Sequence, residues 1–101
     1  MEGQMVGGTS KPNKATKDVQ KLCDEVKHQV EQKAGKNFAT YTATSYTTQV
    51  VAGTNFFVKL HVGGNDYIHV KIYKALPHTG EKPKVTAVQC SKTQHDAIEF
   101  F

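Results

Sequence analysis

The sequence of 101 residues contains neither Arg nor Trp, although it has 13 Lys. Because Arg is the favoured bidentate partner of phosphate groups and guanine, its absence argues against specific binding of nucleic acid. The lysines are scattered and form no long basic run, so the net charge of +4 favours solubility without creating a dense basic patch. Without Trp, the five Phe and four Tyr must supply the bulky side chains of the core.

Cysteines and long apolar runs are also scarce. The two cysteines, Cys23 and Cys90, are fewer than the disulfide framework of a small secreted domain usually carries. Residues 1–8 contain no apolar segment of the kind found in signal peptides, and no apolar run approaches the roughly 20 residues that cross a bilayer. We therefore expect a cytoplasmic protein with reduced thiols and no membrane partner.

The length of the chain allows one domain with one modest core. A chain of this size hides roughly 60–70% of the surface that its unfolded form exposes, which leaves little room for a deep substrate pocket. Residues 1–15 are rich in Gly, Lys and polar side chains, contain Pro12 and show no periodicity. We expect a single domain over residues 1–101, with residues 1–15 as a flexible N-terminal arm.

A helical pattern of apolar residues follows the arm. Its members are Val19, Leu22, Cys23, Val26 and Val30. This spacing predicts the apolar stripe of one amphipathic helix, with Cys23 as a buried core thiol. Thr16 is suited to the N-cap, and Gly35 provides a stop at the C-terminal end.

After residue 37 the composition changes to Thr, Tyr, Val and Phe, which favour strands. We expect strands over residues 38–48 (with a bulge, because its alternation is imperfect), 56–62, 68–73 and 85–90, and a last short strand over 98–101. Short loops between them force antiparallel pairing. The predicted fold class is α+β, with one amphipathic helix packed across a four- to five-stranded antiparallel sheet.

The residues that could carry chemistry do not form a convincing catalytic or metal site. Catalytic Cys and His usually come from distant segments, whereas Cys90 and His95 are close in sequence, so we interpret them as a strand-end Cys and a surface His. His61 and His69 are equidistant from Asn65 and would face each other across a hairpin. Two imidazoles alone make a weak site, so surface histidines without metal are favoured. We expect no enzyme, no catalytic residue, no cofactor and no metal.

Apolar residues stand at places where a loop should be polar. Residues 49–53 lie between two predicted strands, yet they contain two Val and an Ala where turn chemistry favours Asn, Asp, Gly or Pro. The arm has Met5 and Val6 ahead of two glycines, and Leu76 precedes Pro77 in a second loop. Apolar tips of this kind indicate a surface that binds a partner.

The segments around these tips resemble the stefins, the intracellular single-domain branch of the cystatins. The resemblance rests on Gln-Val-Val-Ala-Gly at 49–53 followed by Thr-Asn-Phe-Phe-Val-Lys at 54–59, Glu-Gln-Lys at 31–33, His-Val-Gly at 61–63, Leu-Pro-His at 76–78 and His-Asp at 95–96 before an aromatic C-terminus. It covers nearly the whole chain, and the Leu-Pro-His run is similar to the stefin B (cystatin B) type. The chain departs from that type in a longer segment before the arm glycines and in Ala-Ile-Glu at 97–99.

The resemblance implies a cystatin-like fold and a reversible, competitive inhibitor of papain-like cysteine peptidases of the cathepsin type. In stefins the arm and two hairpin loops form a wedge that enters the active-site cleft of the peptidase. The wedge residues that it implies here are Met5, Val6, Gly7, Gly8, Gln49, Val50, Val51, Ala52, Gly53, Leu76, Pro77 and His78. Val6 would fill the apolar S2 pocket, Met5 the next pocket outward, and Gly7 would let the backbone pass close to the catalytic thiol.

The first hairpin also suggests a homodimer, and another function stays open. Val50 and Val51 are stiff, strand-favouring residues at a turn, so straightening the loop would give one long strand that exchanges with a second copy, as stefin relatives do. The alternative function is a non-catalytic structural or polyanion-binding module, which predicts binding that weakens with salt.

Overall fold

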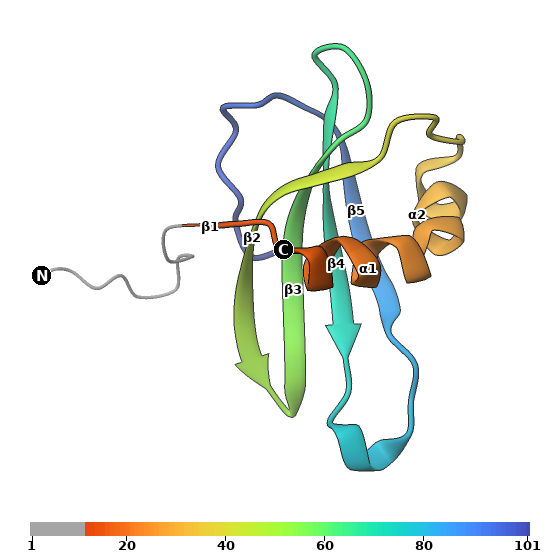
Figure 1. Cartoon of the computed structure of the whole chain (residues 1–101), viewed down its shortest axis with the longest axis vertical. Helices are drawn as coiled ribbons and strands as arrows, with labels where there is room; N and C mark the ends of the chain where they lie inside the picture. Colours follow the sequence, from red (N-terminus) through yellow and green to blue (C-terminus); the bar gives the residue numbers. More distant parts are fainter. Residues whose placement is uncertain (1–11) are drawn as a thin grey trace, which may run out of the picture.

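The computed structural model of the chain describes residues 12–101, which form a five-stranded antiparallel sheet with two helices across one face (Figure 1). The strands follow the order β1-β2-β3-β4-β5, so each strand pairs with its neighbour in sequence. The elements are β1 (Asn13–Lys14), α1 (Lys17–Glu25), α2 (Lys27–Ala34), β2 (Thr42–Val51), β3 (Gly53–His61), β4 (Tyr67–Lys74), the 3-10 helix η1 (Pro77–Thr79) and β5 (Lys84–Lys92). The predicted α+β class is confirmed.

The helical segment is two helices rather than the one that was predicted. The break is at Val26, whose φ of −107° and ψ of 13° leave the helical region and whose N–H donates to the Cys23 carbonyl at 3.3 Å. The side chain of Val26 stays buried, so the apolar stripe continues across the break and its spacing gives no sign of it. The predicted ends are confirmed: the Thr16 hydroxyl accepts from the Val19 N–H at 3.2 Å, and Gly35 has a φ of 77°. Within residues 12–101, no helix has the length and apolar character that would let it cross a membrane.

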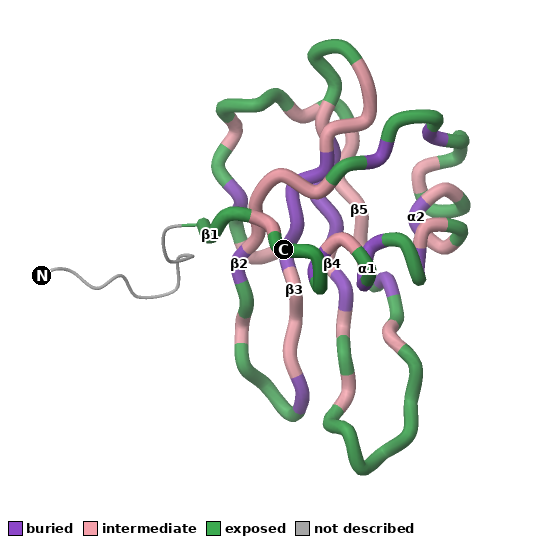
Figure 2. The backbone as a smooth tube through the Cα atoms, viewed as in Figure 1, coloured by how far each residue is buried: buried purple, intermediate pink, exposed green. Residues whose placement is uncertain are grey.

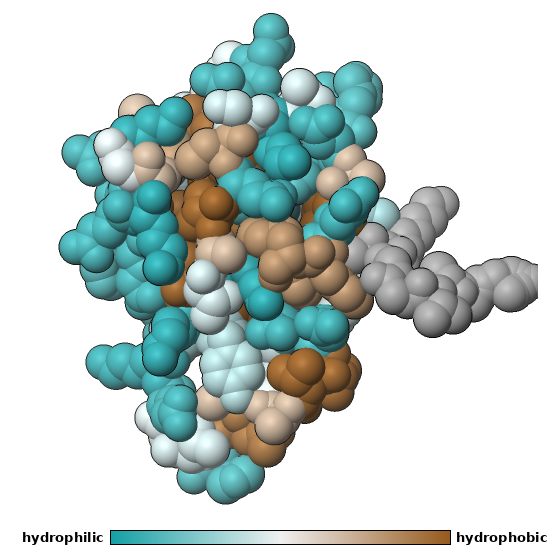
Figure 3. Space-filling view, turned by 180° about the vertical axis from the view of Figure 1, so that it is seen from behind, coloured by the Kyte–Doolittle hydropathy of each residue, from teal (hydrophilic) through white to brown (hydrophobic). Residues whose placement is uncertain are grey.

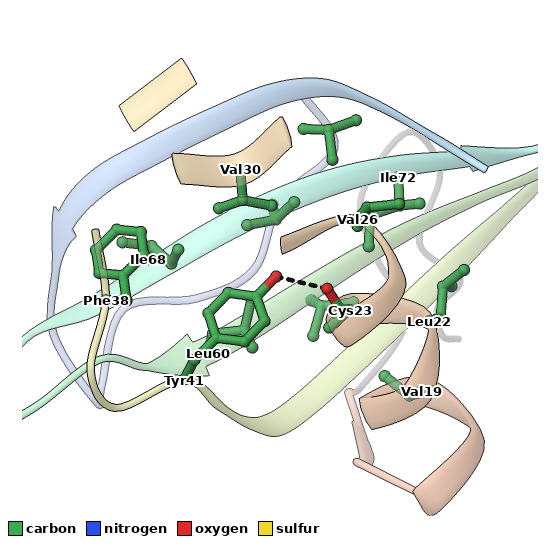
Figure 4. Packing of buried hydrophobic residues seen from close by; sticks show 13 residues of the cluster. Val19, Leu22, Cys23, Val26, Val30, Phe38, Tyr41, Leu60, Ile68 and Ile72 are labelled. Carbon is green, nitrogen blue, oxygen red and sulfur yellow. Dashed lines mark hydrogen bonds between the residues drawn. The ribbon is translucent and has the colours of Figure 1, made fainter. Parts of the chain in front are cut away.

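The main hydrophobic core lies between the helices and the inner face of the sheet. Its buried members are Val19, Leu22, Cys23, Val26, Val30, Phe38, Tyr41, Val58, Leu60, Ile68, Val70, Ile72 and Val85. Figure 4 shows helix side chains pointing toward the sheet and the Tyr41 hydroxyl donating to the Cys23 carbonyl at 2.9 Å. Cys23 is the buried core thiol that was predicted, and burial raises the pKa of its thiol to about 12.

The C-terminal segment covers the outer face of the sheet. The strand predicted over residues 98–101 is wrong, because these residues do not have strand conformation. Instead Ile98 is buried, and the rings of Phe100 and Phe101 lie 4.8 and 5.5 Å from that of Phe57 in β3. Aromatic residues that favour strands here pack through their side chains onto a face that the helices leave uncovered.

Lys59 in β3 holds the start of the same segment. Its ammonium group donates to the carbonyls of Gln94 at 2.7 Å and Asp96 at 2.6 Å. The side chain is buried, and burial lowers its pKa despite the opposing charge of Asp96. A buried ammonium group needs such partners, so Lys59 ties residues 94–96 to the sheet.

The first strands differ in detail from the expected ones. β2 begins at Thr42, not at residue 38, and the predicted bulge is present between Ala43 and Ser45. Asn13 and Lys14, expected at the end of the flexible arm, form β1 and pair with β2. Residues 1–11 of the arm lie outside the described residues, so its flexibility stays a prediction.

Candidate functional site

Exposed apolar side chains gather at one end of the sheet. Among the described residues, the exposed large hydrophobic side chains are Val50 (83% exposed), Val51 (44%) and Leu76 (42%). Val50 and Val51 end β2 next to the β2–β3 turn, and Leu76 lies in the β4–β5 connection. These are the two exposed tips at the lower end of the molecule (Figure 2). Figure 3 shows hydrophobic surface at this end of the outer face. Because the other large apolar side chains among residues 12–101 are buried or half-buried, this patch indicates a contact surface.

The tip of the β2–β3 hairpin keeps its valines extended almost to the turn. Val50 pairs with Thr54 and Val51 with Gly53, which leaves Ala52 at the turn itself. The turn is possible because Gly53 has a φ of 116°, a value that residues with a Cβ rarely adopt. The strand ladder therefore presents Val50 and Val51 to solvent in a fixed, extended conformation.

Contacts on either side of the turn limit its movement. Within the hairpin, the Asn55 side-chain amide donates to the Gln49 side-chain carbonyl at 3.1 Å. On the other side, Gly53 is buried, and a Cβ built on it would lie 2.6 Å from the carbonyl oxygen of Lys74 in β4. The glycine is thus required both by its backbone conformation and by the close approach of β4.

The second loop, residues 75–83, is shaped by its own hydrogen bonds. The backbone N–H and the hydroxyl of Thr79 both donate to the Leu76 carbonyl, at 3.1 and 2.8 Å. Pro77 begins the short helix η1, and Gly80 ends it with a φ of 70°. This arrangement leaves Leu76, Pro77 and His78 exposed beside the first hairpin.

A hollow of about 240 Å³ separates the two loops. It is lined by Gly53, Thr54, Phe56, Lys74, Ala75, Leu76 and Pro77. The structure therefore places the two loop segments that the sequence singled out, residues 49–53 and residues 76–78, next to each other at one edge of the sheet.

The arm residues expected at the same edge are not among the described residues. They are Met5, Val6, Gly7 and Gly8. The direction of β1 is nevertheless informative, because Asn13 pairs with Tyr46 and Lys14 with Ser45 in antiparallel register. Followed from Lys14 back to Asn13, the chain runs along β2 toward the tip of the first hairpin.

The histidine pair expected across the β3–β4 hairpin is absent from the structure. The register pairs His61 with Tyr67 and Lys59 with His69, so the turn is centred one residue earlier than expected. His69 is not the expected surface histidine: it is fully buried, and neither ring nitrogen has a hydrogen-bond partner. Burial, helped by the charges of Lys59 and Lys92, lowers its pKa to about 4. In residues 12–101 there is no group of three or more His, Cys, Asp or Glu able to hold a metal ion.

Cys90 and His95 lie in different surroundings. Cys90 is half-buried and packs against the core on the inner face. His95 is exposed in the turn after β5, where the Asp96 N–H donates to the Thr93 carbonyl at 3.2 Å. This agrees with the interpretation of a strand Cys and a surface His.

Comparison with known proteins gives matches along almost the whole chain. A family model described as "Cystatin domain" matches residues 7–95, which include both loops and part of the arm. The chain is 48% identical over 97 residues to "Cystatin-B" of Oplegnathus fasciatus, covering 96% of this chain and 97% of that protein. It is 39% identical over 100 residues to "Leukocyte cysteine proteinase inhibitor 1" of Sus scrofa, covering 99% and 97%. It is 38% identical over 97 residues to "Cystatin-B" of Homo sapiens, covering 96% and 99%.

Proposed function

The chain belongs to the cystatin family and is similar to its stefin or cystatin B type, and on that premise we propose that it is a reversible, competitive inhibitor of papain-like cysteine peptidases of the cathepsin type. The observation that carries the proposal is the exposure of Val50, Val51 and Leu76 on two adjacent loops at one end of the sheet. The similarity to "Leukocyte cysteine proteinase inhibitor 1" of Sus scrofa supports it.

The two loops act together as a wedge that fills the cleft of the peptidase. Val50 has most of its side chain available for burial, and an apolar anchor of this kind often contributes about 2 kcal/mol at an interface. The strand ladder already fixes both valines, so little conformational entropy is lost on binding. The interface is expected to be about 1,600 Å², the standard size for protease inhibitors.

The arm extends the wedge over the catalytic thiol of the peptidase. Val6 fills the apolar S2 pocket, Met5 the next pocket outward, and Gly7 and Gly8 let the backbone approach the thiol closely. The course of β1, which leads toward the tip of the first hairpin, supports this placement. The arm covers the thiol without aligning a peptide bond for attack, so the inhibitor is not cleaved and can dissociate intact.

The proposal also covers enzymatic activity, cofactors, localisation and oligomeric state. The protein is not an enzyme and needs no cofactor, and it acts in the cytoplasm, where the free thiols of Cys23 and Cys90 stay reduced. A homodimer forms by exchange of the strands that flank residues 49–53, and it lacks the hairpin tip that the wedge needs.

Inhibition of papain by the purified chain and its Val50→Asp variant tests the proposal. Val50 is exposed, so the variant should fold normally, yet burying its carboxylate in the cleft should weaken inhibition at least about tenfold. Thr86→Asp, at an exposed position of β5, is the matched control and should inhibit like the parent chain. Absence of competitive inhibition by the parent chain at micromolar concentration would refute the proposal. Salt-sensitive binding to heparin in its place would favour the polyanion-binding alternative.

A further inference from the structure

Tyr73 in β4 makes an unusual contact with the tip of the first hairpin. Its hydroxyl donates a hydrogen bond to the carbonyl of Ala52, the residue at the turn. The β3–β4 ladder ends at the pair of Thr54 with Lys74, so the side chain reaches past the last paired residues to the turn itself. A strand that is only the neighbour of the hairpin thus holds its tip.

The Tyr73 side chain also packs directly against Gly53. A Cβ at position 53 would lie 2.9 Å from the Tyr73 hydroxyl and 3.0 Å from a ring carbon of the same residue. The backbone of Gly53 therefore lies directly against the tyrosine, and the hydrogen bond to Ala52 is the polar part of a close fit.

The end of β2 pairs with β3 as far as Val51 and Gly53, and this pairing lies within the hairpin itself. Within residues 12–101, β1 pairs with β2 at Ser45 and Tyr46, and residues 47–51 extend beyond that pairing. The bond between Asn55 and Gln49 joins the two arms of the hairpin to each other and not to the rest of the sheet. The contact from Tyr73 to Ala52 adds a side-chain link to β4 beyond the last ladder pair, Thr54 with Lys74.

β4 also carries the second loop. Two residues after Tyr73 the chain enters the 75–83 connection, and both Leu76 and Gly53 line the hollow between the loops. The hydrogen bond from the Tyr73 hydroxyl to Ala52 therefore links the first tip to β4 close to the start of the second loop.

We propose that Tyr73 is a positioning residue that fixes the spacing between the two loops and so keeps the wedge in the shape that fits the peptidase. This role rests on the proposed function. Because the hydrogen bond acts within the inhibitor, its loss lets the hairpin tip move and leaves the docked state less well formed. Association, which depends on collision and overall charge, changes little, whereas dissociation becomes faster.

Three Tyr→Phe variants test this role, each removing one hydroxyl. Tyr73→Phe is expected to dissociate from papain about three- to tenfold faster, the effect of one hydrogen bond. Tyr67→Phe is the matched control at the other end of β4, where the ring lies 5.0 Å from that of His61 and the hydroxyl has no hydrogen bond among the described residues. Tyr41→Phe loses the buried bond to Cys23 and should unfold more easily, yet dissociate from papain at the parent rate.

Amide hydrogen exchange of residues 50–54 in the free variants reports directly on the tip. Exchange should become faster in Tyr73→Phe and stay unchanged in Tyr67→Phe. Parent-like dissociation of Tyr73→Phe overturns the inference while leaving the proposed function intact. Faster dissociation of Tyr41→Phe in proportion to its lost stability also overturns it, because general stability would then explain the effect. If the parent chain does not inhibit papain at all, both proposals fail together.

Discussion

β3 lies between two turns of opposite character. The β2–β3 turn precedes it and exposes Val50 and Val51, whereas the β3–β4 turn follows it with Gly63, Gly64 and an exposed Asn65. Residues 63–66 are of the types usual in a turn that faces water. The two valines, in contrast, leave apolar surface exposed to solvent, which is unfavourable for the free chain. Two hairpins that share a strand thus differ because one tip only reverses the chain and the other is proposed to meet a partner.

The largest difference between the two ends is expected from alanine at Gly53 and Gly63. Their φ values are almost equal, 116° and 118°, but a Cβ at Gly53 would meet β4 at 2.6 Å while one at Gly63 would meet nothing within 4 Å. Both substitutions should lose about 1–3 kcal/mol to backbone strain. Gly53→Ala should lose about 1–3 kcal/mol more through crowding, and most of its inhibition of papain.

Urea unfolding of both glycine variants measures this difference directly. Equal losses of unfolding free energy would mean that β4 yields to the added methyl group and that the tip is not held tightly. Inhibition by Gly63→Ala should match that of the parent chain once the protein is folded.

Lowering the pH should destabilise the fold by protonating His69 in the sheet, and it should not act on the apolar tip of the first hairpin. With a folded-state pKa of about 4 against an ordinary value of 6.5, the buried neutral ring stabilises the fold fully above pH 6.5. That contribution is lost as the pH falls from 6.5 toward 4, by up to about 3 kcal/mol. Unfolding free energies at pH 7 and pH 4 should differ much less in His69→Phe than in the parent chain. An equal difference in both proteins would place the acid sensitivity elsewhere.

Turn residues like those of the β3–β4 hairpin, placed in the first hairpin, should affect both of its proposed roles, in inhibition and in dimer formation. Replacing Val50 and Val51 by Asn-Gly favours a tight turn and removes the apolar contacts. We expect about tenfold weaker inhibition of papain, and less dimer after heating or mild denaturant. Size exclusion followed at once by assay checks both effects in the same sample. A parent dimer as inhibitory per chain as the monomer would show that residues 49–53 are not both the hinge and the wedge.

The smallest effects on inhibition are expected away from both turns, at the cysteines. Cys23→Ala leaves a small void in the core and should cost about 1 kcal/mol of stability or somewhat more. Cys90→Ser alters a half-buried strand position. Because neither residue lies near the loops, both variants should inhibit papain normally, with or without a reducing agent. Loss of inhibition in a folded variant would contradict this assignment.

The sequence predicted the elements that depend on local pattern. The spacing from Val19 to Val30 indicated the helical stripe, and the valines at 50 and 51 marked the tip because they conflict with turn chemistry. The break at Val26 escaped detection because a single non-helical residue leaves the stripe in place.

Features that depend on register and on packing between distant segments could not be read in this way. The β3–β4 turn is centred one residue earlier than its composition suggested, so His69 pairs with Lys59, and the local pattern does not show that His69 is buried. Phe100 and Phe101 resemble a strand in sequence but pack onto Phe57. The contact from Tyr73 to Ala52 depends on how far β4 extends beside the turn, which no local pattern reveals.

Amide hydrogen exchange of the chain, free and bound to papain, tests the central claim most directly because it observes both ends of β3 in one experiment. The account predicts slower exchange on binding for residues 49–53 and 75–78, with residues 62–66 unchanged. Slower exchange at residues 62–66, with none at the valine tip, would contradict it.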